Sequence, residues 1–598
     1  MQQSHLLVCV GRAETLPACV WTHFSVLPEG NAVGVVAPGI SAAGNPMPSS
    51  GFIYSRGAAG FCWTTERPLT SPYLEIQIED NGEVSLLADR FGQLPLYYCR
   101  ESNYWSLSTR LSWVTKLSAN KASLDPDALY QYLFFHCIPA PATIYRGVFR
   151  IDAAQTLSLN PITGALTTRT NWLPDFTKSS DTPTQLSEAL FDTLKSAVTC
   201  RYDNACGTFL SGGLDSSTIT GMMCRYTAGK DAYSIGFPIE RYDESEYAQC
   251  AASHFGANLT SYSVSSGDVV KTLPFIMEAF EQPFGNSSVV PTYFCASLAR
   301  ENGKQLLLAG DGGDELFGGN ERYRKQLLFE HFNRLPAYLR GGTEQLLSAL
   351  PFQGARLISK ARSYVSQASI PLPDRLHSYN LLKRIDLRSL LSEDFLQAHN
   401  STQVAAQQHE RFQEVNSNAL NRMLYLDWKY TLCDNDLVKV NTMCSLAGID
   451  VAYPMLDYAL VDLSASLPSD LKIHRHELRH LFKRSMSEFL PGKILNKSKH
   501  GFGLPYGYWL QQDKSLERLT FDSIDSLTEL GVFAPNLANN VLSLNSGEHA
   551  HYFGELAWVL MALGIWVDRV HNSRPAEQGP PMMVDTLPTD TVISRATP

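Results

Sequence analysis

Four short apolar segments, each followed by a helical pattern, occupy the middle of the sequence. They read GTFL, AYSIGF, LTSYSV and QLLLAG, and all lie between residues 207 and 310. Strands that alternate with helices predict a parallel sheet, because a parallel pair of strands needs a crossover connection and a helix supplies it. In such a sheet the loops at the carboxyl ends of the strands meet at one edge, where ligands bind. The alternation therefore restricts this segment to an α/β domain.

The pattern differs on either side of this segment. Up to about residue 170 the sequence indicates strands and turns, and YLEIQIEDNGEVSLLAD predicts a β-hairpin that turns at Asn81-Gly82. A helical pattern begins near residue 180, and helices predominate after residue 320. A chain of 598 residues is too long for one ordinary domain. We predict domains at residues 1–175 and 180–572, and a disordered tail rich in Pro, Ser and Thr at 573–598.

The composition excludes several classes of protein. Acidic residues outnumber basic ones, 59 to 49, and the net charge of −10 argues against a general nucleic-acid binder. The 12 cysteines include no C-x-x-C pair, which is typical of reduced thiols. No export signal is visible, and the most apolar run, Leu556 to Val567, is shorter than the roughly 20 residues that cross a bilayer. We expect a cytoplasmic protein without membrane contact, in which this run forms a buried helix.

The loop after the first strand, SGGLDS at residues 211–216, suits a nucleotide. Glycines at a strand end let backbone N–H groups approach phosphate oxygens, and the following helix adds the positive end of its dipole. Asp215 is compatible with phosphates only if a divalent cation lies between them, and Mg²⁺ prefers carboxylate and phosphate oxygens. No Gly-Lys-Ser/Thr follows, so the loop is not of the Walker type. A tight strand–helix turn built from small residues is the structural alternative.

A second loop repeats this design further along the chain. The strand QLLLA is followed by GDGGDE at residues 310–315. Two strand ends of one parallel sheet can face one ligand, so Asp215 and Asp314 can share a magnesium ion on a triphosphate. An exposed acidic turn is the alternative for this loop.

The two loops resemble those of the N-type ATP pyrophosphatases, and in particular those of asparagine synthetases, where they follow in the same order. The late segment KSKHGFGLPYGYWL, residues 497–510, resembles the K-x-G-F-x-x-P segment of the same family. The resemblance implies that Lys499 reaches the phosphates and stabilises charge that develops during acyl transfer. Lys497 is expected to be a solvated surface lysine and is the second candidate for this role. The residues implied to bind ATP are Leu210, Ser211, Gly212, Gly213, Asp215, Ser216, Ile235, Gly236, Gly310 and Lys499, with Asp215 and Asp314 on Mg²⁺.

The front of the chain resembles the glutamine amidotransferase domain that precedes the synthetase domain in this family, through DRFGQLPLYY at residues 89–98. That domain is an Ntn-type αββα sandwich whose N-terminal cysteine hydrolyses glutamine. Here position 2 is Gln2, and Cys9 and Cys19 lie inside the chain without a free amine. The R-G-P-D segment of the family is reduced to Arg56-Gly57. The resemblance therefore implies an amidotransferase fold without its nucleophile, followed by a parallel-sheet ATP-pyrophosphatase domain with a helical C-terminal part.

Without internal ammonia, the nucleophile must be another amine. The resemblance extends to lasso-peptide macrolactam synthetases, in which an Asp or Glu side chain of a precursor peptide is adenylated and the peptide's N-terminal amine closes the ring. It implies a leader peptidase and a leader-binding protein as partners in the same pathway. Asp311 is a candidate to orient or deprotonate the amine, and capping of the following helix is its alternative role.

Two departures bear on the substrate. The acidic-basic pair that the family has after Lys439-Val440 is here Asn441-Thr442, and Ala452 stands where an arginine is common. These departures weigh against recognition of a small amino acid. An asparagine synthetase homologue that uses free ammonia, and a β-lactam-type synthetase, are the alternatives among enzymes. A non-catalytic scaffold is disfavoured because both loops and Lys499 are intact.

Overall fold

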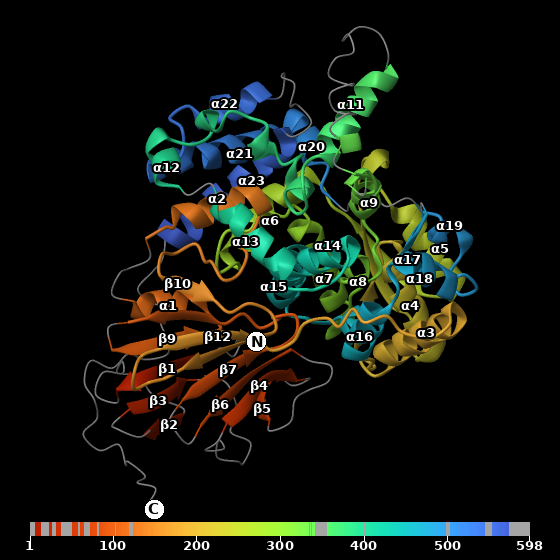
Figure 1. Cartoon of the computed structure of the whole chain (residues 1–598), viewed down its shortest axis with the longest axis horizontal. Helices are drawn as coiled ribbons and strands as arrows, with labels where there is room; N and C mark the ends of the chain where they lie inside the picture. Colours follow the sequence, from red (N-terminus) through yellow and green to blue (C-terminus); the bar gives the residue numbers. More distant parts are fainter. Residues whose placement is uncertain are drawn as a thin grey trace, which may run out of the picture. The chain divides into compact units, whose positions relative to one another are not determined.

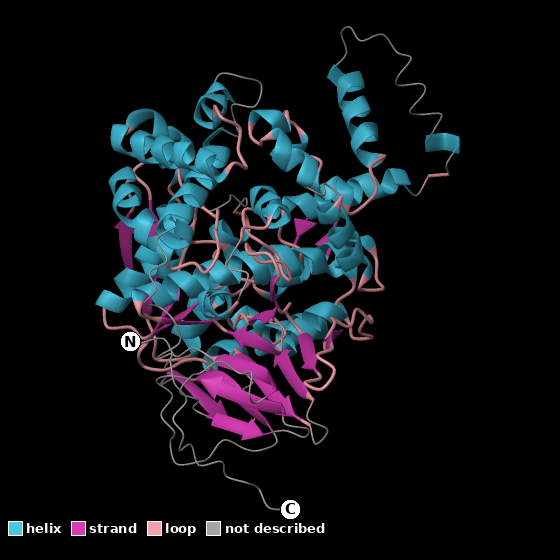
Figure 2. Ribbon diagram, turned by 90° about the vertical axis from the view of Figure 1, so that its left-hand side faces the viewer, coloured by secondary structure: helices cyan, strands magenta, loops and turns pink. Residues whose placement is uncertain are grey.

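The computed structural model describes most of the chain and falls into two compact units. The first unit comprises Met1–Ala128, Ala140–Trp172 and His571–Pro598, and the second comprises Leu129–Pro139 and Leu173–Val570. Figure 2 shows that strands dominate one unit and helices the other. The described residues are 6–12, 23–26, 31–36, 51–57, 60–64, 72–79, 83–101, 103–118, 123–333, 335–336, 338–340, 356–399, 402–475, 477–497, 503–544 and 553–572.

The first unit contains two antiparallel sheets of six strands each (Figure 1). Their orders are β10-β8-β9-β1-β3-β2 and β12-β11-β7-β6-β4-β5. The bounds are β1 Leu7–Arg12, β2 His23–Val26, β3 Asn31–Val36, β4 Gly51–Gly57, β5 Gly60–Thr64, β6 Tyr73–Ile78, β7 Val84–Ala88, β8 Tyr97–Arg100, β9 Tyr104–Ser108, β10 Val148–Arg150, β11 Gln155–Leu159 and β12 Leu166–Thr170, with helix α1 Leu111–Leu117. Helix α2, Pro126–Phe135, begins in this unit, and most of it belongs to the second unit.

One apolar core joins the two sheets of this unit. Val8 of β1, Leu107 of β9, Leu74 of β6 and Leu157 of β11 belong to a single buried cluster. The predicted hairpin is confirmed, since β6 and β7 pair antiparallel with Ile76 opposite Leu86. Its turn, Asn81-Gly82, lies outside the described residues. The two sheets therefore form the sandwich expected of an amidotransferase-like domain.

The second unit is built on a five-stranded parallel sheet, as the alternation of strands and helices predicts. The strand order is β15-β14-β13-β16-β17, and each neighbouring pair is parallel. The strands are β13 Cys206–Phe209, β14 Asp231–Gly236, β15 Asn258–Ser263, β16 Leu306–Leu308 and β17 Asp450–Ala452. The helices from β13 to β16 are α4 Leu214–Tyr226, α5 Ser245–Phe255, α6 Ser266–Glu278 and α7 Val289–Glu301, and the first helix after β16 is α8 Gly313–Phe317. The α/β fold of this unit is thus confirmed.

Helix α3, Pro183–Thr199, leads into this sheet and shows how its sequence sets its limits. The apolar side chains that recur every four residues along this helix are all buried: Leu186, Leu190, Leu194 and Val198. The Thr182 hydroxyl caps the first turn by accepting from the Gln185 backbone N–H, and the Gln185 side-chain oxygen accepts from the Thr182 backbone N–H, which forms a capping box. Proline at the first helical position suits this start, because its missing N–H would have no partner there.

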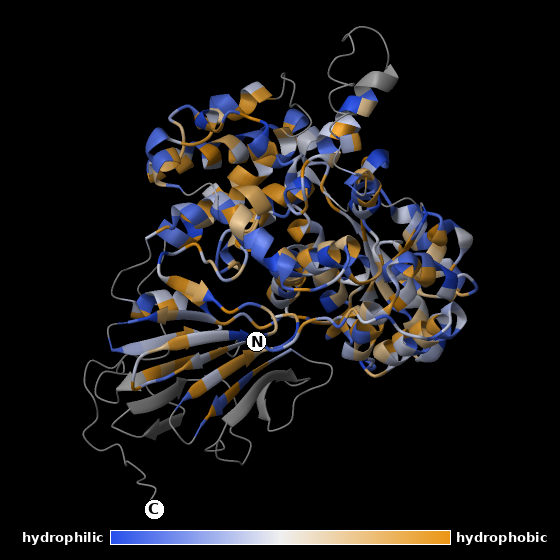
Figure 3. Cartoon of the chain, viewed as in Figure 1, coloured by the Kyte–Doolittle hydropathy of each residue, from blue (hydrophilic) through white to orange (hydrophobic). Residues whose placement is uncertain are grey.

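The rest of the second unit is mainly helical, and its most apolar helix is α23, Phe553–Trp566. Its residues from Leu556 to Trp566 are buried, and Figure 3 shows it as hydrophobic along its length. No helix in the described part of the chain is both long and apolar enough to cross a membrane. The other elements are α9 Glu321–Asn333, α11 Arg356–Ala368, α12 Glu393–Ala398, α13 Gln403–Gln413, α14 Ala419–Asp427, α15 Leu437–Ala447, α16 Tyr458–Ser466, α17 Ser469–Lys472, β18 Ile473–His474, β19 Glu477–Leu478, α18 His480–Ser485, α19 Gly492–Leu495, α20 Tyr506–Gln512, α21 Lys514–Ser526 and α22 Leu537–Ser543.

Candidate functional site

The first loop connects the carboxyl end of β13 to α4 and is closed by its own serines. The hydroxyl oxygens of Ser211 and Ser216 lie 3.0 Å apart, and the Gly213 amide donates to the Ser211 hydroxyl at 3.3 Å. Gly212 has φ +70°, and a β-carbon there would lie 2.5 Å from that of Tyr247. No side chain caps the start of α4 at Gly213. Its first N–H groups therefore remain suited to an anion.

The second loop follows β16, which pairs in parallel with β13, so the two loops leave the sheet side by side. A β-carbon on Gly310 would lie 2.9 Å from the amide nitrogen of Ser216, and one on Gly313 would collide with the carboxylate of Asp215. The loops are therefore in contact, and glycine is required where they meet. Their proximity agrees with the expectation of one ligand facing two strand ends.

Asp215 and Asp314 converge on one cationic group, the guanidinium of Arg479. Both Nη atoms donate to Asp215, with Nη2 2.8 Å from Oδ2, and Nη2 also donates to Asp314. The side chain of Arg479 is only 7% exposed. Hard carboxylate oxygens that meet at one cation are the donor set that Mg²⁺ prefers, so these two residues fit the predicted metal. The described residues contain no cluster of three or more His, Cys, Asp or Glu that could hold a metal ion by itself.

A third strand, β14, ends near the two loops; it pairs with β13 on the side opposite β16. Leu210 is buried and donates its amide to the Tyr233 carbonyl at 2.8 Å, so the predicted nucleotide residues Leu210, Ile235 and Gly236 lie at neighbouring strand ends. A β-carbon on Gly236 would lie 2.7 Å from the Ser245 hydroxyl.

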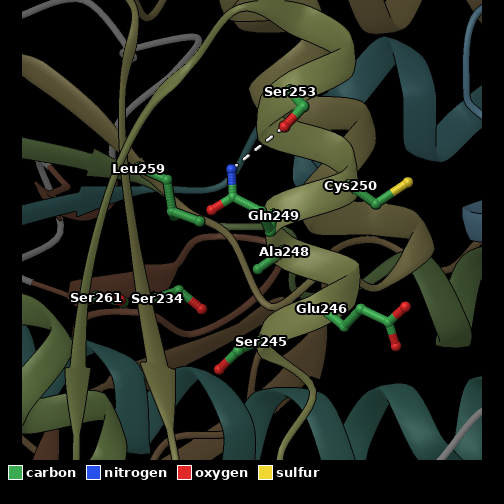
Figure 4. A pocket seen from close by; sticks show the side chains of 9 residues that line it. All are labelled: Ser234, Ser245, Glu246, Ala248, Gln249, Cys250, Ser253, Leu259 and Ser261. Carbon is green, nitrogen blue, oxygen red and sulfur yellow. Dashed lines mark hydrogen bonds between the residues drawn. The ribbon is translucent and has the colours of Figure 1, made fainter.

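A cleft of about 460 Å³ lies between α5 and strands β14 and β15 (Figure 4). Its lining residues include Ser234 and Ser261 from the strands, and Gln249 and Ser253 from α5, which share a hydrogen bond of 3.2 Å. Among the described residues, neither lysine nor arginine lines this cleft. It therefore lacks the cations that a phosphate site needs, and the two acidic loops remain the candidate site.

Asp311 lies in the second loop and is partly buried. Burial raises its pKa to about 6; Lys439 acts against this rise, while Asp436 and Asp215 add to it. The ammonium of Lys439 lies 2.7 Å from Asp436. The alternative role of Asp311, capping the next helix, is wrong, because α8 has Gly312 at its N-cap and no side-chain capping bond. Glu315, in the first turn of α8, is buried and its pKa is raised well above its usual value by burial, with Asp436 and Asp427 adding to the rise.

The late segment requires one correction. Lys499 lies outside the described residues, so its role stays a prediction. Lys497 is not a solvated surface lysine, since its side chain is 7% exposed. Its Nζ donates to the Gly212 carbonyl at 3.3 Å, pairs with Glu244 at 3.0 Å and lies 4.4 Å from the centre of the Tyr247 ring. This lysine therefore ties the segment before Lys499 to the first loop.

The departures from the family pattern lie in helix α15 and in the edge strand β17. Tyr453 donates its hydroxyl to Asn441 at 2.8 Å, so Asn441 makes a neutral bond at a position that carries charge in the family. Ala452 ends β17, and its carbonyl accepts from the Ala309 amide at 2.9 Å. Ala309 immediately precedes the second loop. Ala452 is therefore hydrogen-bonded to the residue before the acidic loop, and Asn441 is hydrogen-bonded to the residue after Ala452.

Of the two cysteines considered as nucleophiles, only Cys9 lies among the described residues of the first unit. Cys9 is buried in β1 and packs with Trp113 and Leu117, so its thiol is enclosed. Gln2 and Cys19 lie outside the described residues. Arg56 and Gly57 end β4, and only their backbone is described.

Fold and site together define a class. A parallel sheet whose neighbouring strand ends bring a Ser-Gly loop and an acidic Gly-rich loop onto one cation is an arrangement for a nucleotide and a divalent metal. The chain belongs to the asparagine synthase family, whose model matches residues 189–568. A glutamine amidotransferase domain model matches residues 74–172. Members of the asparagine synthase family are ATP-dependent enzymes that form amide bonds.

Several curated proteins are similar to the chain. Asparagine synthetase [glutamine-hydrolyzing] 1 of Bacillus subtilis is 26% identical over 433 residues, 71% of this chain and 66% of that protein. A putative asparagine synthetase of Mycobacterium bovis is 26% identical over 445 residues, 73% of this chain and 67% of that protein. A putative asparagine synthetase 2 of Methanocaldococcus jannaschii is 31% identical over 267 residues, 43% of this chain and 51% of that protein. The chain thus spans about two thirds of the length of the first two relatives, and about half of the third.

Two features of the site were missed in the sequence: the role of Arg479, and the burial of Lys497 against the first loop. Arg479 follows a two-stranded hairpin in the sequence HRHELRHLFKR, which contains several other basic residues. Its hydrogen bond to Asp215 joins residues 264 positions apart. No local pattern distinguishes it from its basic neighbours.

Proposed function

We propose that the chain is an ATP- and Mg²⁺-dependent ligase that activates a carboxylate by adenylation. The observation that carries this proposal is the convergence of Asp215 and Asp314, from two strand-end loops, on one cationic group. Two carboxylates at one point suit the metal of a metal–triphosphate complex. The Ser-Gly loop beside them and the uncapped start of α4 suit the phosphates.

The chemistry consists of two displacements. In the first, a carboxylate oxygen attacks the α-phosphorus of ATP, and pyrophosphate leaves. In the second, an amine attacks the acyl carbon, AMP leaves, and the amine loses a proton. Lys499 is our candidate for stabilising the developing charge, and Asp311 for orienting or deprotonating the amine. A carboxyl whose pKa is near 6 is largely ionised at neutral pH and can still accept a proton.

The finer part of the proposal names the substrate. The activated carboxylate is the side chain of an Asp or Glu in a precursor peptide, and the nucleophile is the N-terminal amine of the same peptide, so the product is a macrolactam. The enclosed thiol of Cys9 and the neutral Asn441 and Ala452 support an amine other than ammonia and an acid larger than a free amino acid. Attack within one molecule gains the effective concentration that a diffusing amine lacks. A leader peptidase and a leader-binding protein would be partners.

Exchange of labelled pyrophosphate into ATP tests the proposal. The purified protein is assayed with linear peptides that carry a free N-terminus and an internal Asp or Glu, and in parallel with free aspartate. We expect exchange with a peptide, followed by a product that has lost one water. Exchange driven by aspartate alone would establish the ammonia-using alternative, and absence of ATP affinity would leave only a scaffold. Asp314→Asn serves as the inactive control.

A further inference from the structure

Arg479 joins the two acidic loops although it comes from a distant part of the second unit. It forks onto both oxygens of Asp215 and reaches Asp314 with one of the same nitrogens. Forked arginine–carboxylate pairs combine charge with fixed geometry, so they hold a guanidinium firmly. One organic cation therefore contacts both carboxylates that we assign to Mg²⁺.

The backbone places Arg479 at this point at some conformational cost. It has φ 56° and ψ 38°, the left-handed region, which is unfavourable for a residue with a β-carbon. Such residues persist where their surroundings fix them, and they gather at functional sites. Gly319 supplies the space, because a β-carbon there would collide with both Asp314 and the Arg479 guanidinium. The hairpin of β18 and β19 precedes this residue, and α18 follows it.

The charges of the three groups do not allow a metal ion or a triphosphate to enter alone at low cost. A divalent cation that took both carboxylates would leave the guanidinium, whose side chain is 7% exposed, beside two further positive charges. A metal-free triphosphate would bring several negative charges against Asp215 and Asp314. When both enter together, the carboxylates pair with the metal and the guanidinium pairs with phosphate oxygens. Every charge then has a partner.

We propose that Arg479 is an internal counterion that competes with the divalent cation for Asp215 and Asp314, so that metal binds tightly only together with the nucleotide phosphates that receive the guanidinium. The inference rests on the proposed function and extends it, because it assigns an interdependence to metal and nucleotide binding and names the residue that enforces it. Arg479 acts on binding, and it is not assigned a part in either displacement.

The test measures the affinity of Mn²⁺ with and without α,β-methylene-ATP, an analogue that resists cleavage between its α and β phosphates. For the wild-type protein we expect weak Mn²⁺ binding alone and at least hundredfold tighter binding with saturating analogue. Arg479→Gln should bind Mn²⁺ alone at least tenfold more tightly than wild type. The same substitution should reduce the coupling between Mn²⁺ and the analogue at least tenfold. Arg479→Lys keeps the charge but loses the forked geometry. Its Mn²⁺ affinity and its coupling should lie between those of wild type and Arg479→Gln.

Arg201→Gln is the matched control. Arg201 is 5% exposed and pairs with Asp457 at 2.9 Å, so its loss removes a similarly buried ion pair outside the acidic loops. The Mn²⁺ affinities of this variant, measured with and without α,β-methylene-ATP, should stay within twofold of those of wild type. Unchanged Mn²⁺ binding and coupling in Arg479→Gln would overturn the inference. If that variant does not fold, the wild-type protein still decides, because tight Mn²⁺ binding without nucleotide contradicts competition by Arg479.

The experiment also separates the two proposals. It uses neither the carboxylate nor the amine substrate, so its outcome is independent of whether a peptide is the substrate. An analogue that fails to bind at any Mn²⁺ concentration would refute the proposed use of ATP. An analogue that binds without coupling to Mn²⁺ would refute only the role of Arg479.

Discussion

Replacing Lys497 by methionine tests how the candidate site is assembled. The ammonium of Lys497 contacts the Gly212 carbonyl and the Glu244 carboxylate, at 3.3 and 3.0 Å, and the stem of the side chain is enclosed. Methionine keeps much of the apolar stem and removes the charge. The carbonyl of Gly212 then loses its cation within a loop that we assign to phosphate, and a carbonyl dipole without a cation repels phosphate oxygens.

The magnitude follows from these contacts. A hydrogen bond to a charged group is worth about 1.5–3 kcal/mol, and Glu244 is 21% exposed, so water compensates part of its loss. We expect a loss of about 2 kcal/mol shared between folding and ATP binding. If most of it falls on the bound state, the KM for ATP rises about 10- to 30-fold. Turnover at saturating ATP should change by less than about threefold, because uniform binding is lost without an effect on the transition state.

Lys493→Met is the matched control for Lys497→Met. Lys493 also lies over the Tyr247 ring, at 5.2 Å, and also pairs with a glutamate, Glu246, but its side chain is 40% exposed. We expect its KM for ATP to stay within about twofold of wild type, as is usual for an exposed pair. ATP-dependent pyrophosphate exchange gives KM and turnover, and thermal unfolding gives stability. A Lys497→Met protein that loses stability while its KM for ATP is unchanged would refute the reasoning.

The remaining predictions concern single groups of the proposed machinery. Asp215→Asn and Asp314→Asn should each abolish pyrophosphate exchange while far-ultraviolet circular dichroism stays that of wild type, because each removes a proposed metal ligand but keeps the shape of the side chain. Lys499→Ala should lower turnover more than ATP affinity, measured by exchange and by titration, and near-normal product formation would contradict its assigned role. Because the pKa of Asp311 is raised to about 6, its contribution to stability is present below about pH 4 and is lost as pH rises through 6, so urea unfolding should show Asp311→Asn gaining relative to wild type over that interval. Gln2→Cys alone should give no glutaminase activity, and glutamate release in a coupled assay would contradict this.

The sequence was sufficient for the features that local pattern controls. The alternation of strands and helices predicted a parallel sheet, and the two loops at the ends of β13 and β16 are in contact as expected of strands that pair in register. The hairpin of β6 and β7 was predictable because period-two alternation fixes which face each side chain takes. Helix α5 follows β14 as the alternation predicts, and it begins at Ser245, after a short 3₁₀ turn, Glu240–Tyr242.

Features that depend on tertiary contact were not predictable in the same way. The segment after β9 lies in the part of the chain where the sequence indicates strands and turns, but it forms helix α1, whose Trp113 and Leu117 pack on the sheet. Burial of that apolar face overrides weak local propensity. Lys497 was expected to be a solvated surface lysine. Its burial comes from Gly212 and Glu244, which are remote in the chain.

These failures have a common physical origin that bears on the site itself. The anionic half of the site, Asp215 and Asp314, lies within strand–loop–helix units, where short-range geometry fixes each carboxylate. The cationic half comes from residues 479–497, since Arg479 and Lys497 both reach the first loop from more than 260 residues away. Opposite charges that arrive from distant segments hold the site together only when residues 479–497 have docked on the sheet. ATP affinity should therefore report on that docking, and substitutions in α18 or α19 that weaken it should lower the affinity for nucleotide even where they touch no phosphate.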